Sequence, residues 1–133
     1  GEVAWIHQFG SDRTDNATGV AVARNGDVFV AGWTEGDVGG PNDGGPDGFL
    51  GRWTPDGDPV WTSQFGGSGI DFVIGVAADG DGAVAVGSTD GDVAGPSAGG
   101  QDAYFVRFDA DGAEVGAAQL GGQIHKLDIT AKR

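Results

Sequence analysis

Aspartates recur in two long Gly-rich loops of this chain, and their side chains are the groups best suited to chemistry. The loops, Thr34–Phe49 and Thr89–Tyr104, lie 55 residues apart. Calcium prefers several oxygen ligands, including carboxylates and backbone carbonyls, and glycine lets the backbone turn its carbonyls inward. The loops therefore predict calcium as a candidate cofactor. The candidate metal ligands are Asp37, Asp43 and Asp47 in the first loop and Asp92 and Asp102 in the second.

The same aspartates have a second interpretation, as residues that stabilise turns. An Asp side chain at a turn hydrogen-bonds to the backbone beside it, and this chain has no EF-hand spacing. Asp43 has no counterpart in the second loop, where Ala98 stands in its place. Asp15 and Asp71 form a further recurring pair, open to the same two interpretations. The sequence leaves calcium binding and turn formation as alternatives.

Trp33 is the candidate for ligand binding, because the second repeat has Ser88 at this position. An aromatic ring at a strand end beside a long loop is placed to stack on a sugar, but packing in the core is the favoured interpretation. The recurring Arg52 and Arg107 are expected to form structural ion pairs. Trp5 and Trp61 also recur, and we expect them to pack between structural units.

No catalytic signature is recognisable in the chain. The two histidines, His7 and His125, fall outside the repeated positions. The segment Gly67–Gly69 lacks the outer glycines of a hydrolase nucleophile elbow, and no phosphate-binding loop is followed by Lys and Ser or Thr. We therefore expect a protein that is not an enzyme.

Composition narrows the classes of partner. The 133 residues include 20 acidic and 7 basic side chains, for a net charge of −13. Such a chain repels nucleic-acid phosphates and anionic membrane surfaces, so neither is an expected partner. No apolar stretch is long enough to insert in a bilayer, and the absence of cysteine excludes disulfides and thiol chemistry.

An internal repeat determines where all these residues stand. The strings GEVAWIHQFG, GDPVWTSQFG and GAEVGAAQLG begin at Gly1, Gly57 and Gly112. A regular period in this range indicates a structural unit that stacks on copies of itself. The repeat divides the chain into a first unit over 1–56, a second over 57–111, and a partial third over 112–133 with a divergent basic tail.

Each repeat predicts four short strands separated by Gly-rich turns, such as the one at Asn25 and Gly26. Four strands at this period favour an all-β fold of β-propeller blades, each with four antiparallel strands. We expect about two blades plus an extra N-terminal strand over Glu2–Phe9, and we expect the apolar first strand to be buried on both faces. The predicted strands are Gly19–Ala23, Val28–Trp33, Gly48–Trp53 and Val60–Phe65, then Gly75–Ala78, Val84–Ser88, Ala103–Phe108 and Glu114–Leu120.

Several strings carry a resemblance to a known family. The first repeat has QFGS at 8–11, GVAV at 19–22, NGDVFVAG at 25–32 and DGF at 47–49, and the second has QFGG at 64–67, GVA at 75–77 and DAY at 102–104. These strings resemble the SBBP repeat of bacterial seven-bladed β-propellers over about residues 1–121. The resemblance implies a propeller in an extracellular or cell-surface protein, and it implies no single activity.

The number of blades that a propeller needs to close indicates which partners to expect. A propeller needs about four blades to close, and two alone leave apolar faces and strand edges uncovered. We therefore expect a homo-oligomer or filament, or other blades of a longer chain, and we expect the isolated chain not to be a folded monomer. The expected function is a non-catalytic extracellular scaffold, and the alternative is a glycan- or calcium-dependent binding module.

The tail, Gln123–Arg133, does not follow the repeat. It carries Lys126, Lys132 and Arg133 against a single acid, Asp128. One interpretation is a divergent terminal strand. The other is a basic strand that pairs with an acidic edge of a neighbouring copy.

Overall fold

The computed structural model describes residues 1–42, 44–97, 99–121 and 128–131, and these residues form two antiparallel sheets. The all-β prediction is confirmed. The described residues include no helix, and therefore none suited to crossing a membrane. We call the sheets blade 1 and blade 2. Blade 1 holds β1 (Asp15–Val22), β2 (Val28–Thr34), β3 (Asp47–Trp53) and β4 (Pro59–Phe65), and blade 2 holds β5 (Asp71–Asp79), β6 (Gly82–Thr89), β7 (Asp102–Phe108), β8 (Glu114–Leu120) and β9 (Asp128–Ala131), each in this order.

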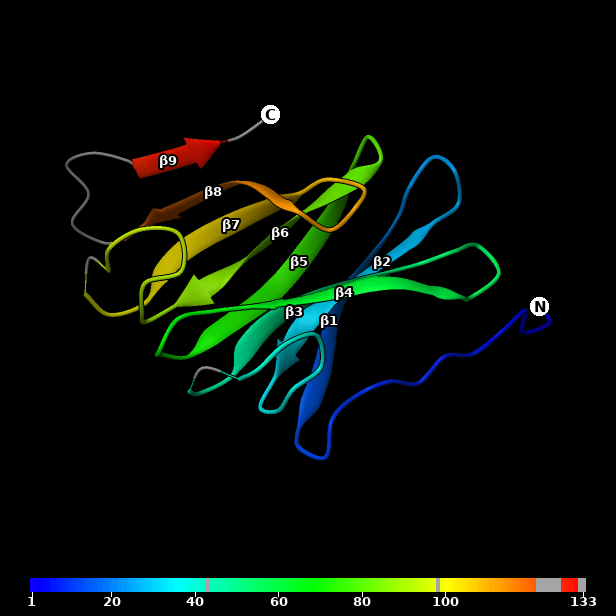
Figure 1. The fold of residues 1–133 in the computed structure, drawn as a ribbon, viewed down its shortest axis with the longest axis horizontal. Coiled ribbons are helices and arrows are strands. Elements are labelled where there is room, and N and C mark those ends of the chain that lie inside the picture. The colour runs from blue at the N-terminus through cyan, green and yellow to red at the C-terminus, as the bar shows by residue number, and fades with distance from the viewer. Residues whose placement is uncertain (43, 98, 122–127, 132–133) are drawn as a thin grey trace.

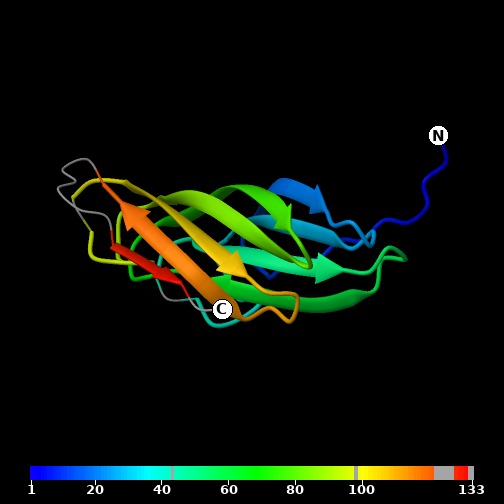
Figure 2. The ribbon, with the colours of Figure 1, turned by 90° about the horizontal axis from the view of Figure 1, so that it is seen from above.

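The two blades pack face to face, and β5 lies against β1, β2 and β3 (Figures 1 and 2). This close approach is possible because residue 19 is a glycine. A Cβ atom there would lie only 3.3 Å from the Val76 side chain, which is tighter than an ordinary contact. The Thr18 hydroxyl donates a 2.5 Å hydrogen bond to the carbonyl of Val73. The junction buries the core of the molecule, which includes Phe29, Leu50, Val73, Val106 and Phe108.

The predicted Asn-Gly turn joins β1 to β2. The Ala23 N–H donates to the Asp27 carbonyl, and the Gly26 N–H donates to the Ala23 carbonyl. Gly26 has φ +93°, in the region that favours glycine. Gly57 has φ +89° at the corresponding turn between β3 and β4. These glycines therefore set the positions at which the strands reverse.

The first strand of each blade differs from the prediction in length and burial. β1 and β5 begin at Asp15 and Asp71, four residues early, and each is interrupted by an irregularity in register. The expected burial on both faces is wrong, because Val20 and Val22 are 65% and 63% exposed. The face that carries them points away from blade 2, and among the described residues no sheet covers it.

The extra strand expected over Glu2–Phe9 is also wrong, since residues 1–14 form no strand. A strand needs a neighbour for its backbone groups, and β4 already pairs with β3 in blade 1. The segment instead lies beside blade 1 and contacts it through side chains. At the other end of the chain, residues 128–131 of the tail pair with β8 of the same chain. Lys126, Lys132 and Arg133 lie outside the described residues.

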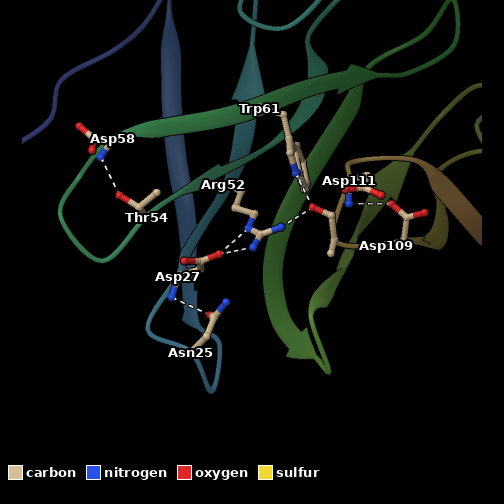
Figure 3. Close-up of polar contacts among 9 residues, drawn as sticks. Asn25, Asp27, Arg52, Thr54, Asp58, Trp61, Asp109 and Asp111 are labelled. Carbon is tan, nitrogen blue, oxygen red and sulfur yellow. Dashed lines mark hydrogen bonds and ion pairs between the residues drawn. The ribbon is translucent and has the colours of Figure 1, made fainter.

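Polar contacts join the blades at the end where the hairpin turns lie (Figure 3). Arg52 on β3 forms an ion pair with Asp27 and donates to the carbonyl of Ala110 in the β7–β8 turn. The Trp61 indole N–H donates to the same carbonyl at 2.8 Å. On blade 2, Arg107 pairs with Asp79. The expected structural role of both arginines is therefore confirmed by their partners.

Candidate functional site

Two of the predicted calcium ligands act within turns. One carboxylate oxygen of Asp37 accepts a 2.9 Å hydrogen bond from the backbone N–H of Asn42. Asp92 does the same for Ser97 at 2.8 Å in the second blade. Each carboxylate therefore stabilises its own loop, as the turn interpretation requires.

The other candidate ligands are placed at the start of the third strand in each blade. Asp47 and Asp102 are 1% exposed and accept hydrogen bonds from the side-chain amides of Gln64 and Gln119, at 3.2 and 2.9 Å. Asp43 lies outside the described residues. In the described ranges no three His, Cys, Asp or Glu side chains gather closely enough to hold a metal ion. Calcium binding stays a prediction.

The glutamine of the QFG string, which is QLG in the second blade, organises each long loop, a role that the sequence analysis missed. The Gln64 side-chain oxygen accepts from the N–H groups of Val38 and Gly39, at 2.8 and 3.1 Å, while its amide donates to the Gly36 carbonyl. Gln119 repeats this pattern in blade 2. The recurrence of QFG was the available signal. One glutamine side chain therefore connects the fourth strand of each blade to its loop.

Asp15 and Asp71 join the start of their strands to the preceding loops. Asp71 accepts hydrogen bonds from the Thr89 hydroxyl at 2.5 Å and from the Gly67 N–H at 3.0 Å. Asp15 accepts the corresponding bonds from Thr34 and Ser11, at 2.5 and 2.7 Å. The pair therefore has the same structural role in both blades.

The carboxyl groups of Asp15 and Asp71 differ in pKa. Burial raises the pKa of Asp71 to about 6, and the nearby charges of Asp47 and Asp90 add to the rise, against its hydrogen bonds. Burial also acts to raise the pKa of Asp15, but the hydrogen bonds from Thr34 and Ser11 leave that pKa lowered. The difference has two causes: Asp71 is fully buried, and Asp15 accepts further hydrogen bonds from the Ser11 hydroxyl, which Gly67 lacks.

The stability of the fold should consequently fall as the pH rises from about 4 to about 6. A carboxyl with a raised pKa binds its proton more tightly in the folded state, so its stabilisation is complete below the ordinary value of 3.8 and is lost as the pH rises through about 6. The expected loss is about 2 kcal/mol in the free energy of unfolding. Urea unfolding at several pH values measures it. The Asp71→Asn variant should lack this dependence and Asp15→Asn should keep it; equal pH dependence in all three proteins would contradict the assignment.

A polar pocket of about 470 Å³ lies beside the long loop of blade 1. Ser11, Asp12, Arg13, Glu35 and Asp37 contribute to its lining. In blade 2 the residues that correspond to Ser11 and Arg13 are glycines. A Cβ on the second of these, at position 69, would lie 2.0 Å from a carboxylate oxygen of Asp90. The same backbone hydrogen bond joins the loops in both blades, from Glu35 to Thr14 at 2.9 Å and from Asp90 to Ile70 at 3.2 Å, so the blades differ here in their side chains.

Trp33, the predicted ligand-binding residue, lies at the junction between the blades. Its ring meets the ring of Phe72 edge to face, with centroids 5.2 Å apart. Trp33 is half-buried. Its position therefore agrees with the packing interpretation, and sugar binding stays a prediction.

The N-terminal segment, residues 2–9, contacts blade 1 in the way that β4 contacts blade 2. The Trp5 indole N–H donates to the Pro55 carbonyl at 2.9 Å, and the Trp5 ring fills the hollow at Gly57. Trp61 makes the same two contacts with Ala110 and Gly112. The segment therefore stands where the fourth strand of a preceding blade would stand.

Comparison with known proteins agrees with this arrangement. Residues 4–40, which span the N-terminal segment, β1 and β2, match the family model of the SBBP beta-propeller repeat. No curated protein matches the chain. Over residues 4–40 the chain therefore matches an SBBP-type beta-propeller repeat, and its two antiparallel sheets, of four and five strands, are consistent with propeller blades.

Proposed function

We propose that this chain is a non-catalytic scaffold of an extracellular assembly, and that its copies associate through the blade faces that the chain leaves uncovered. One observation carries the proposal: residues that are buried at the internal junction have exposed counterparts at the outer end. Leu50 and Ala31 of blade 1 are fully buried, whereas their counterparts Phe105 and Val86 of blade 2 are 36% and 41% exposed.

The strand register supports the assignment of these faces. Val76 points toward blade 1, because it meets Gly19 there, and side chains alternate along a strand. The adjacent Gly75 pairs with Val86, which pairs in turn with Phe105, so these side chains point away from blade 1. Together with Val20 and Val22 on the far side of blade 1, they leave an apolar patch at each end of the stack. Exposed apolar patches of this kind mark interaction surfaces.

Sedimentation velocity over a range of concentrations tests the proposal. We expect the chain to form species larger than a monomer, and we expect Phe105→Asp to weaken their formation at least tenfold. Ala113→Asp is the matched control, because it adds the same charge to an exposed turn of the same blade. A chain that stays a folded monomer at every concentration would contradict self-association and would assign the missing faces to further blades of a longer chain.

A second candidate function is the binding of a glycan or a calcium-bridged ligand. The polar pocket of blade 1 favours it, because this pocket combines carboxylates, an arginine and an amide beside the predicted calcium loop. A glycan array and calorimetry with calcium on metal-stripped protein test this function. Absence of binding and an unchanged melting temperature would reject it.

A further inference from the structure

The N-terminal segment, residues 2–9, makes only part of the contacts of a fourth strand. Its aromatic side chains pack on blade 1: the Phe9 ring lies 5.7 Å from Phe49 and 4.8 Å from Trp53. Its backbone, however, belongs to no strand, and Val3 and Ile6 are 71% and 82% exposed. An extended segment with unpaired backbone groups is a template for pairing with another strand.

Gln8 shows which kind of strand the segment lacks. Its counterparts Gln64 and Gln119 each bind the long loop and the buried aspartate of their own blade. Gln8 is exposed, and its side chain has no hydrogen-bond partner within the described residues. The missing partner therefore has the chemistry of a third strand that begins with Asp and follows a Gly-Asp-Val loop. β7 and the loop before it have this chemistry.

The strand that now pairs with β7 is a weaker version of the segment. At the position of Trp5 and Trp61, β8 has Gly116, and at the position of Phe9 and Phe65 it has Leu120. Either strand would form the same backbone hydrogen bonds with β7, but β8 also pairs with β9, so the aromatic side chains must offset the loss of that pairing. Buried Trp and Phe rings dominate the energetics of such interfaces. Trp5, now 37% exposed, would gain burial in this position.

We propose that the N-terminal segment of one copy replaces β8 in blade 2 of a second copy. This inference rests on the proposed self-association and specifies which strands of the two copies pair. The segment keeps its place on its own blade 1, so the new junction reproduces the contacts of β4 with blade 2. Blade 2 of the second copy then covers the face that carries Val20 and Val22. The resulting contact is head to tail, and repetition of it forms a ring or a filament.

Engineered disulfides test the exchange, because the chain has no cysteine of its own. Ala118 on β8 pairs with Phe105 on β7, and His7 is the counterpart of Ala118. Oxidation of a mixture of His7→Cys and Phe105→Cys chains should therefore link two copies. Val3→Cys is the matched control, since Val3 lies in the same exposed segment but four residues before His7, and so away from the position opposite Phe105. Equal linking by both cysteines, or none, would overturn the exchange.

A locked variant separates this inference from self-association itself. Phe105→Cys combined with Ala118→Cys would tie β8 to β7 within one chain. We expect the oxidised protein to remain monomeric in sedimentation and to associate again after reduction. Association of the locked protein would overturn strand exchange but leave self-association standing. A wild-type chain that is monomeric at every concentration would overturn both.

Discussion

Replacement of Trp61 by alanine should lower the free energy of unfolding by about 3 kcal/mol. The indole ring packs directly on Gly112, where a Cβ atom would lie only 2.8 Å from the ring. The ring also packs against Phe29 and Phe108, with ring centroids 6.1 and 6.2 Å away. The substitution also leaves the Ala110 carbonyl without its 2.8 Å hydrogen bond from the indole. Because the ring bridges both blades, the loss should loosen their junction as well as one sheet.

Denaturant unfolding followed by circular dichroism measures this loss, and Trp5→Ala is the matched control. Trp5 makes the equivalent hydrogen bond and fills the equivalent hollow at Gly57, but it is 37% exposed and stands on a segment without a strand partner. We expect a loss of about 1 kcal/mol or less for the control, because partly exposed side chains bury less apolar area. Equal losses for the two variants would contradict the view that Trp61 bridges the blades.

Replacement of Gly87 by alanine should be at least as damaging, with a loss of about 3 kcal/mol or more. A Cβ at this position would lie 1.7 Å from the Phe72 carbonyl oxygen and 3.0 Å from the Val73 Cα. These are backbone atoms of the adjacent β5, at the irregularity in its register with β6. The strand cannot move aside without breaking its pairing. Gly32 has the same environment in blade 1, where a Cβ would lie 1.9 Å from a backbone oxygen.

Gly75→Ala serves as the control for this prediction. Gly75 lies on β5 at the same irregularity, but the nearest atom to its Cβ position is a methyl carbon of Val86 at 3.4 Å. We expect its melting temperature to fall by only a few degrees, as for a loss of about 1 kcal/mol or less. If Gly87→Ala melted like this control, β5 and β6 would have to be less closely paired than the structure indicates.

The contacts between the blades are local and recurrent, and this bears on the proposed scaffold function. Trp61 and Arg52 reach the same carbonyl of the β7–β8 turn, and Trp5 reaches the corresponding carbonyl one repeat earlier. Each blade therefore offers one set of donors to the next blade and one acceptor to the preceding blade. A module of this kind extends in one direction, which is the geometry that head-to-tail assembly requires.

Much of the fold was predictable from the sequence because repeats and turns leave local signals. Asn25 and Gly26 indicated a hairpin, and the recurrence of Trp5 and Trp61 indicated packing between units, as the structure confirms. The N-terminal segment was wrongly predicted as a strand because its pattern matches β4. A pattern reports the side chains that a strand presents, whereas pairing depends on a neighbour for its backbone.

The candidate site was less predictable, because its properties arise between segments that are distant in the chain. Gln64 was visible in a repeated string, but its role depends on a loop that begins about thirty residues earlier and folds back over β4. Asp15 and Asp71 are equivalent in the sequence and share hydrogen bonds from a threonine hydroxyl and a backbone N–H, yet the pKa is lowered in one and raised in the other. The Ser11 hydroxyl, which binds Asp15 alone, is visible in the sequence, whereas the burial of Asp71 follows from the packing of the two blades.

The sequence by itself determined the repeated unit, its four strands, its turns and the aromatic and charged positions that recur in it, because these follow from local backbone preferences and periodicity. The tertiary structure alone decided which faces are covered. It buried Leu50 and left Phe105 exposed, although the two occupy the same position in their repeats. The physical reason is that burial, and with it hydrophobic stabilisation and pKa, depends on what lies across a junction and not on the residues of one strand.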